Sequence, residues 1–566
     1  MNNFIIFTTY YVLILLSIIG YGLYFLKILK IKLDFINFGY AGLFGIYILI
    51  IYSYFSNLFI AHSEIHNLLV LFIGLILFFY SMKKKYILYK SEIIIFVIVF
   101  SLLFIAVIQF KNHDDFPYYH FPYTYYLTQQ SLYIGVGQFN HGFRTPSSIF
   151  YISSLFYLPY AKFYLFNFIS IFILGFANII LLNKLFKRSK FLFSKNNQKN
   201  FIYFLSLLSF IFINIFFYRM AEYRTDRAAM ILVFLFVIEL LKFLTTRIIK
   251  KNNLFTIYIF GALIISFKAF YILYIIFILP LFFYILKKKK TYIKSLYFLF
   301  FNKHFLLFII LFLFVLFTYY INTGCLIYPL SFTCFNEISW GIPISEVNLM
   351  NSWYELWSKA GANPNFRIDN PEEYIKSFNW VNNWIDMYFF NKVSDFILGV
   401  ILLIIITLFL FRNVFFNKKI MRLDNQVFLV YLLILMLGFE WFYNHPALRY
   451  GGYHILALML FIPISVKLGL LKINVKEYSK KVIILISLTT IIFISRNINR
   501  IMNEVELYNF QPISKTYYFI DDGHFRIQKH MDKLIKHHNK CKKEKIECNT
   551  EPKIKNVIGK IVFINQ

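Results

Sequence analysis

Residues 36–61 read INFGYAGLFGIYILIIYSYFSNLFIA, an apolar stretch without a charged residue. A run of about 18–20 apolar residues is long enough to cross the hydrocarbon core of a bilayer as a helix. Similar stretches recur along the chain, at 4–26, 65–82, 92–110, 164–186, 201–218, 228–246, 254–267, 269–286, 304–320, 395–411, 426–443, 453–471 and 482–495. The sequence therefore predicts an all-α polytopic membrane protein with about 14 transmembrane helices, or 13 if one of these spans is not separate.

The overall composition excludes an ordinary soluble protein. Of the 566 residues, 59% are hydrophobic and only 15% are charged, whereas charged residues make up about 25% of a typical soluble domain. Intrinsic disorder is excluded as well, because disordered chains are poor in the bulky apolar residues that are abundant here. The net charge of +31 leaves nucleic acid as a partner to consider, so the position of the charges decides their meaning.

The basic residues cluster in alternate loops between the predicted spans. By the positive-inside rule these loops are cytoplasmic and the N-terminus lies outside. The charge thus sets topology and predicts no nucleic-acid partner, although the basic residues of the tail 497–566 stay unexplained. The clusters are Lys27/Lys30/Lys32, Lys83–Lys85, Lys187/Arg188/Lys190, Arg247/Lys250/Lys251, Lys287–Lys290, Lys418/Lys419/Arg422 and Lys476/Lys480/Lys481.

This topology divides the chain into a transmembrane domain, 1–496, and a small extramembrane α/β tail domain, 497–566. The outward segments of the transmembrane domain are 111–148, 219–227, 321–394 and 443–452. Lys268 separates two short spans and is costly at mid-membrane, so we interpret it as an outward turn. The tail is outward if there are 14 helices and cytoplasmic if there are 13.

Four cysteines occur as two short-range pairs in outward segments. Cys325 and Cys334 lie in the long loop, and Cys541 and Cys548 lie in the tail. An oxidising compartment favours two disulfides, more strongly for the first pair. The alternatives are free thiols or, in the tail, a metal knuckle, although no other cysteine completes a zinc site.

The most distinctive polar cluster is His113-Asp114-Asp115, which follows a predicted span, with His120 shortly after it. Two adjacent carboxylates raise each other's pKa, and a cation or a basic group relieves their repulsion. Such a pair suits general-base catalysis or a divalent metal, with Asp115 as a candidate ligand. A solvated polar helix end is an equal alternative.

Other charged side chains cluster in the remaining outward segments. Glu222 and Asp226 have i,i+4 spacing and would share one helix face beside Arg224, although a self-paired surface is the simpler interpretation. Arg449-Tyr450 suits bidentate binding of phosphate, or snorkelling to lipid headgroups. The remaining candidate anion-binding residues are Lys268, His141 and Arg144.

These outward motifs, in this order, resemble the GT-C superfamily of polytopic glycosyltransferases. Asp114-Asp115 with Tyr118-Tyr119-His120 is similar to the family's acidic motif in the first large outward loop. RMAEYRTDR at 219–227 resembles its second loop, and Arg449-Tyr450 matches a late Arg-Tyr. The chain departs from the family in having three predicted spans before the acidic loop and Gly451-Gly452 after Tyr450.

The resemblance implies a transferase that moves a sugar from a polyprenyl-phosphate donor to a lipid, glycan or protein acceptor. Asp114 or Asp115 would deprotonate the acceptor, with Glu222 and Asp226 as further catalytic carboxylates. Arg449, with Lys268 or Arg224, would stabilise the departing phosphate, and His113, His120, His141, Arg144 and Tyr450 would bind substrate. The family implies the inner (cytoplasmic) membrane of a bacterium with a periplasmic active face. A divalent cation, magnesium or manganese, stays open as a cofactor.

Other functions compete with this one. A transporter or flippase of lipid-linked glycans would carry charged residues buried mid-helix and show internal symmetry. A glycan polymerase fits the long loop 321–394, and in a non-catalytic membrane assembly protein the loop acids would be incidental. Motifs for ATP or NAD binding are missing from the sequence.

Overall fold

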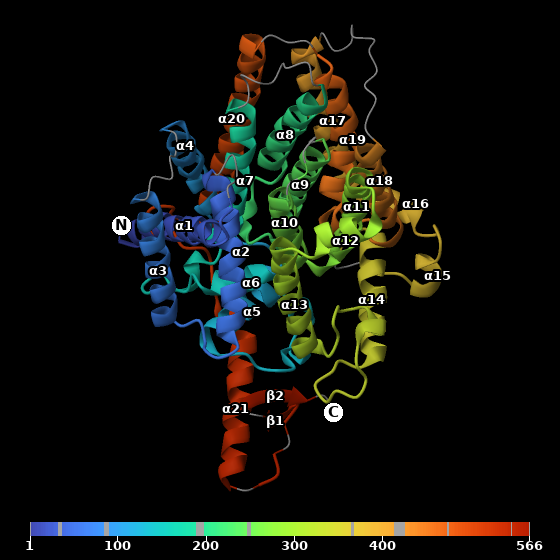
Figure 1. Cartoon of the computed structure of the whole chain (residues 1–566). Helices are drawn as coiled ribbons and strands as arrows, with labels where there is room; N and C mark the ends of the chain where they lie inside the picture. Colours follow the sequence, from blue (N-terminus) through green and yellow to red (C-terminus); the bar gives the residue numbers. More distant parts are fainter. Residues whose placement is uncertain are drawn as a thin grey trace.

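The chain folds as a long bundle of helices in a computed structural model (Figure 1). The structure describes residues 2–31, 37–83, 90–187, 197–245, 249, 251–363, 367–412, 425–471, 475–544, 546–548, 550–557 and 559–564. Several residues of the predicted cytoplasmic clusters lie outside these ranges: Lys32, Lys84, Lys85, Arg188, Lys190, Arg247, Lys250, Lys418, Lys419 and Arg422.

Every predicted span coincides with a helix. Within the described ranges, ten helices are long and apolar enough to cross a membrane, so the chain is a multi-pass helical membrane protein. The count of about 14 stays a prediction, because the apolar stretches Ser91–Val107, Asn200–Phe216 and Lys251–Phe267 are shorter and α9 carries four charged residues. The helices are α1 (Asn2–Ile28), α2 (Phe38–Asn57), α3 (Glu64–Lys83), α4 (Lys90–Val107), α7 (Phe168–Lys187), α8 (Asn197–Phe216), α9 (Thr225–Leu244), α10 (Leu254–Phe267), α11 (Ile278–Lys289), α12 (Tyr292–Phe300), α13 (Lys303–Thr323), α17 (Ser394–Leu410), α18 (Asn425–Asn444), α19 (Gly452–Gly469) and α20 (Val475–Tyr508).

Small residues allow the first helices to pack closely. A Cβ on Gly22 of α1 would lie 1.7 Å from the carbonyl oxygen of Ala41 in α2, and a Cβ on Gly20 would lie 2.1 Å from that of Gly74 in α3. Membrane helices associate through such close backbone contacts because burial from lipid supplies little hydrophobic driving force. These glycines therefore fix the contacts of α1 with α2 and α3.

The outward segments contain short helices. The first loop contains a π-helical turn, η1 (Phe116–His120), followed by α5 (Phe121–Gln129), and α6 (Ser148–Ser154) begins at its end. The long loop contains α14 (Ile344–Lys359), α15 (Pro371–Ile375), α16 (Val381–Trp384) and a π-helical segment, η10 (Ile385–Val393), that leads into α17.

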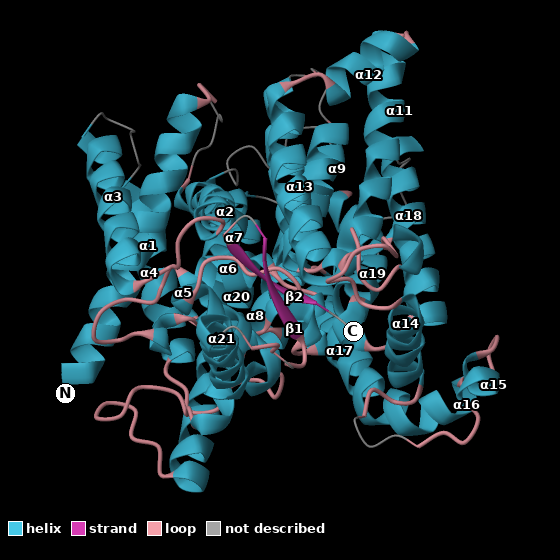
Figure 2. Cartoon of the chain, turned by 90° about the horizontal axis from the view of Figure 1, so that it is seen from below, coloured by secondary structure: helices cyan, strands magenta, loops and turns pink. Residues whose placement is uncertain are grey.

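The tail packs against the first outward loop. α20 continues across the predicted domain boundary at 496/497, and α21 (Arg526–Glu544) follows it. Strands β1 (Lys553–Val557) and β2 (Lys560–Ile564) form an antiparallel hairpin, which confirms a small α/β tail. Figure 1 shows α21 and this hairpin at the lower end of the molecule, and in Figure 2 they lie in front of the bundle.

Backbone hydrogen bonds join the tail to that loop. The amide of Phe563 donates to the carbonyl of Ile134 at 2.9 Å, and the amide of Phe519 donates to the carbonyl of Phe110 at 2.9 Å. The tail therefore lies on the same face of the protein as loop 111–148.

Candidate functional site

Four charged side chains from distant parts of the chain meet at the end of the bundle that carries the predicted outward loops. Arg449 Nη2 lies 2.7 Å from Asp115 Oδ2, and Arg449 Nε lies 3.4 Å from Asp226 Oδ2. Lys268 Nζ lies 2.8 Å from Asp226 Oδ1. We call Asp115, Asp226, Lys268 and Arg449 the charged cluster. Their side chains are 15–30% exposed, so the cluster is accessible from outside the protein.

Local backbone structure positions Asp115. The amide of His113 donates to the carbonyl of Glu222 at 3.1 Å, which ties the two outward loops together. Asp115 then precedes the π-helical turn η1, in which Pro117 occupies an early position where its missing N–H costs nothing. Single π-helical turns are frequent at functional sites. Here the turn brings the hydroxyl of Tyr119 to 3.3 Å from Asp115 Oδ2.

A residue in the left-handed backbone conformation sets the direction of the segment that contains Glu222 and Asp226. Tyr223 has a φ of 61° and is buried, and it separates the 3-10 turn that ends at Glu222 from helix α9. A side chain larger than glycine is rare in this conformation, so the surrounding contacts must impose it. The Tyr223 hydroxyl bonds Thr124 at 2.9 Å. Asp226 follows in the first turn of α9, where a negative charge is favoured by the helix dipole.

The helix break at Lys268 supplies the first cation. α10 ends at Phe267, and Lys268 is extended, with φ −153° and ψ 114°. The chain then continues as a 3-10 segment, η8 (Ala269–Phe277), into α11. The break lies beside the start of α9, where Lys268 reaches Asp226.

Arg449 supplies the second cation from the turn between α18 and α19. Gly451 has a φ of 124°, a conformation that favours glycine and lets the chain enter α19 directly after Tyr450. The guanidinium of Arg449 lies 5.5 Å from the ring centre of Trp357 on α14. Trp357 also contacts the ring of Tyr450, with centroids 5.7 Å apart. The long outward loop therefore covers one side of the cluster.

Charge pairing fixes the protonation states of the cluster. Burial acts to raise the pKa of Asp115, but the charge and hydrogen bond of Arg449, together with His120 and His113, outweigh it and hold the pKa well below its usual range. The carboxylates of Asp226 and Asp115 in turn raise the pKa of Arg449, against the effect of burial. Two carboxylates thus face two cations. A divalent cation at Asp115 would have to replace Arg449 as its counter-charge.

The neighbouring histidines are neutral at pH 7. Burial, with the positive charge of Arg224, lowers the pKa of His113 to about 4. Burial lowers the pKa of His120 to about 3. His113 Nδ1 accepts a hydrogen bond from the amide of Asp115 at 3.1 Å, so it orients the loop. His120 packs its ring against Tyr223 and Phe150.

Other predicted residues lie outside the charged cluster. The side chain of Asp114 is 85% exposed and faces Lys111, so Asp115 alone of the acidic pair enters the cluster. Glu222 is buried between Arg219 and Arg224, with Arg224 Nη2 at 2.5 Å, and serves as their counter-charge. Tyr450 follows Arg449 in the chain, and its ring contacts Trp357 beside the cluster.

Arg144 and His141 belong to a different contact region. Arg144 Nη2 lies 2.8 Å from Glu346 Oε1 on α14, and Arg144 Nη1 donates to the Tyr328 hydroxyl at 3.3 Å. These bonds join the first outward loop to the long loop. The exposed side chain of His141 lies with its ring centroid 6.4 Å from that of Tyr119, while Gly142 packs under the Tyr119 ring.

Sequence reasoning missed two residues that contact the cluster. Tyr119 follows Asp115 by one helical turn, and this spacing could have indicated it. Trp357 lies within the predicted long loop 321–394, and its ring lies 6.5 Å from that of Trp353. Trp380 and Trp384 are instead buried against each other.

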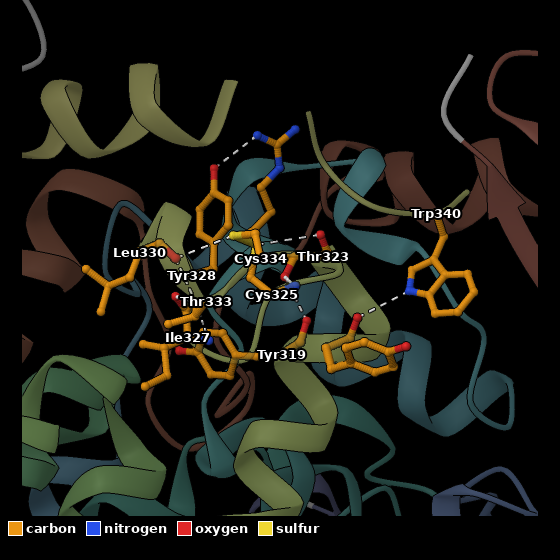
Figure 3. The surroundings of a disulfide bond; sticks show 11 residues. Tyr319, Thr323, Cys325, Ile327, Tyr328, Leu330, Thr333, Cys334 and Trp340 are labelled. Carbon is orange, nitrogen blue, oxygen red and sulfur yellow. Dashed lines mark hydrogen bonds between the residues drawn. A yellow bond between two sulfur atoms is a disulfide. The ribbon is translucent and has the colours of Figure 1, made fainter. Parts of the chain in front are cut away.

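Both cysteine pairs are disulfides in the structure. Cys325 and Cys334 close the start of the long loop, and Figure 3 shows Thr323, Tyr328 and Thr333 around them. Cys541 and Cys548 close the end of α21. If this second disulfide were reduced, His537 would lie close enough to its cysteines to share a metal ion with them. Within the described ranges, this is the one group of three or more possible metal ligands.

The chain was compared with known proteins. No curated protein and no solved structure matches it. One family model, described as a domain of unknown function (DUF8201), matches residues 4–456. This range contains all four residues of the charged cluster and ends before α20 and the tail. Because the match covers most of the transmembrane domain, the chain belongs to the DUF8201 family.

Proposed function

We propose that the protein is a membrane glycosyltransferase that moves a sugar from a polyprenyl-phosphate donor to an acceptor hydroxyl on a lipid, glycan or protein. The observation that carries this proposal is the meeting of Asp115, Asp226, Lys268 and Arg449 at the outward end of the bundle. A carboxylate beside two cations offers both a proton acceptor and a counter-charge for a departing phosphate. The proposal places this end of the bundle on the periplasmic face of a bacterial inner membrane.

The reaction is a single displacement at the anomeric carbon. The acceptor oxygen forms the new glycosidic bond while Asp115 takes its proton. The bond between the anomeric carbon and the phosphate oxygen breaks, and its electron pair leaves with the lipid phosphate. Arg449 and Lys268 stabilise the negative charge that develops on that oxygen. Attack from the face opposite the leaving group inverts the configuration of the sugar.

Arg449 also adjusts the basicity of Asp115. In the structure Arg449 is paired with Asp115, and the low pKa of this carboxyl makes it a weak base. A donor phosphate that draws the guanidinium toward itself would lower the positive potential at Asp115 and raise its pKa toward the working pH. Donor binding would therefore activate the base.

The aromatic surface beside the cluster suits a sugar. Trp357 lies over Arg449, and its neighbour Trp353 is 39% exposed. Indole rings pack against the apolar faces of sugar rings, and they lose little conformational entropy when they do so. We assign the acceptor or the donor sugar to this side of the cluster.

The acidic pair offers a matched test. Cells that lack the gene are complemented with the wild-type protein, Asp115→Asn or Asp114→Asn, and their surface glycans are compared at equal membrane levels of protein. Loss of a general base costs about 10²–10⁴ in rate, so Asp115→Asn should abolish the glycan change. Asp114→Asn, one residue away but exposed, should restore it. Equal behaviour of the two variants would contradict the proposal, as would release of no polyprenyl phosphate in membranes from wild-type cells.

A further inference from the structure

A second polar region lies beside the charged cluster and is not used by the proposed reaction. Asp226 and Arg227 are neighbours in the first turn of α9, but their side chains point to different sides. Asp226 joins the charged cluster, whereas Arg227 lies over the rings of Phe217 and Tyr453, 5.6 and 5.9 Å from their centres. Arg227 helps to line a cavity of about 550 Å³ between α8, α17, α19 and α20.

One end of this cavity is strongly basic. Arg219, Arg224, Arg227 and Arg496 line it, and Asp395 is the acidic residue among its lining. Glu222 provides one further counter-charge, which Arg219 and Arg224 share. Four guanidinium groups thus face two carboxylates, which leaves a surplus of two positive charges. A phosphate monoester carries about −1.5 to −2 at pH 7 and would neutralise this surplus.

Arg227 and Arg496 have unused hydrogen-bonding capacity. Nη1 of Arg227 is buried and has no hydrogen-bond partner among the described residues. Neither Arg227 nor Arg496 has a carboxylate within ion-pair distance in the described part of the chain. Arg496 donates to the Ile215 carbonyl at 2.7 Å, and its guanidinium lies 3.9 Å from the ring centre of Tyr218. A buried donor without a partner costs about 1–3 kcal/mol, which a phosphate oxygen would recover.

The other end of the cavity is apolar and elongated. On α17 its lining extends from Asp395 to Thr407, and on α20 it extends from Leu485 to Arg496. At a rise of 1.5 Å per residue, these stretches are about 18 Å and about 16 Å long. Leu402 and Leu488 line the cavity and are 58% and 40% exposed, so the groove opens sideways to the surroundings of the bundle.

We infer that this cavity binds a membrane lipid with a terminal phosphate, which places its headgroup at Arg227 and Arg496 and its chain in the groove between α17 and α20. The charge surplus selects the phosphate, and the lateral opening allows the chain to enter from the bilayer. The inference does not depend on glycosyl transfer, because it concerns binding alone.

Native mass spectrometry of the full-length protein in detergent provides the test. The probes are polyprenyl phosphate, polyprenol with the same chain, and inorganic phosphate. We expect polyprenyl phosphate to bind at least about tenfold more tightly than either control, since both the charge and the chain contribute. Equal binding of polyprenol would overturn the phosphate site, and equal binding of inorganic phosphate would show a free-anion site with no role for the chain.

Variants locate the site. Arg496→Met, at an exposed position, and Arg227→Met should each weaken polyprenyl phosphate binding by about tenfold. Leu402→Trp should fill the groove and abolish lipid binding while the arginines remain. Lys481→Met, on the opposite end of α20 and paired with Glu477, is the matched control and should bind normally. Unchanged binding to folded Arg496→Met and Leu402→Trp proteins would overturn the inference.

Discussion

Arg449 and Asp115 form an ion pair at 2.7 Å although 334 residues separate them in the sequence. The same guanidinium reaches Asp226, so one cation from the turn before α19 holds together carboxylates from the first loop and from α9. This arrangement makes Arg449 the residue on which the geometry of the cluster depends most.

Replacement of Arg449 tests that dependence. Arg449→Gln leaves Asp115 without its main counter-charge and should lower the free energy of unfolding by about 2 kcal/mol, less than for a fully buried pair because the site is partly exposed. The thermal midpoint in detergent measures the change. In the double variant with Asp115→Asn, part of the loss should return, because no unpaired carboxylate remains at 115. A double variant with purely additive losses would argue against the pair.

Glu222 should matter for stability rather than for chemistry. Its side chain is 2% exposed and compensates Arg219 and Arg224, so Glu222→Gln leaves two cations without their counter-charge. Removing one partner of a buried ion pair costs about 3–5 kcal/mol. We expect a marked fall in the melting temperature and in the amount of folded protein. Glu346→Gln, whose partner Arg144 keeps other hydrogen bonds, is the milder control.

The histidines of the first loop predict a pH dependence of stability. The folded-state pKa of His113 is about 4 and that of His120 about 3, both below the ordinary value of 6.5, because burial disfavours the charged form. Between these limits the unfolded chain binds more protons than the folded one. Stability should therefore be full above pH 6.5 and fall as the pH drops from 6.5 toward 4.

Melting curves from pH 8 to pH 4 measure this effect. His120→Gln should flatten the decline, because the group that resists protonation is gone. The exposed His530 on α21 provides a control, since His530→Gln should leave the decline unchanged. A melting temperature that is constant between pH 6.5 and pH 4.5 would contradict the assignment of neutral, buried histidines.

The disulfide Cys325–Cys334 should stabilise the long outward loop. The two cysteines are nine positions apart, and cross-linking a loop of this length removes unfolded-state entropy worth about 2.5 kcal/mol. Cys325→Ser with Cys334→Ser should lower the melting temperature and expose the loop to protease near Arg144 and Glu346. The double serine variant of Cys541 and Cys548 is the control and should affect the tail alone. Identical protease patterns for both variants would count against a role in the loop.

The helical architecture was predictable from local sequence. A bilayer leaves no water for backbone amides, so each apolar stretch must satisfy its own hydrogen bonds as a helix, whatever its neighbours are. The helix break at Lys268 was also predictable, because a lysine side chain is costly inside the membrane. The length of α20 was not, because its polar continuation to Tyr508 carries no apolar signal.

The candidate residues were also recognisable, because they form charged clusters in loops that border the predicted spans. Sequence alone did not separate Asp115 from Asp114, since both follow the same helix. Neighbouring residues at the start of η1 point in different directions, so Asp115 faces Arg449 while Asp114 is exposed.

The sequence by itself thus determined a helical membrane chain and the set of charged residues in its predicted outward loops. Only the tertiary structure decided which of them meet. Asp115, Asp226, Lys268 and Arg449 come from four separate segments, and the packing of the helices that these segments join sets their distances. The arginine-lined cavity is likewise invisible in the sequence, because residues of five helices, α8, α9, α17, α19 and α20, line it.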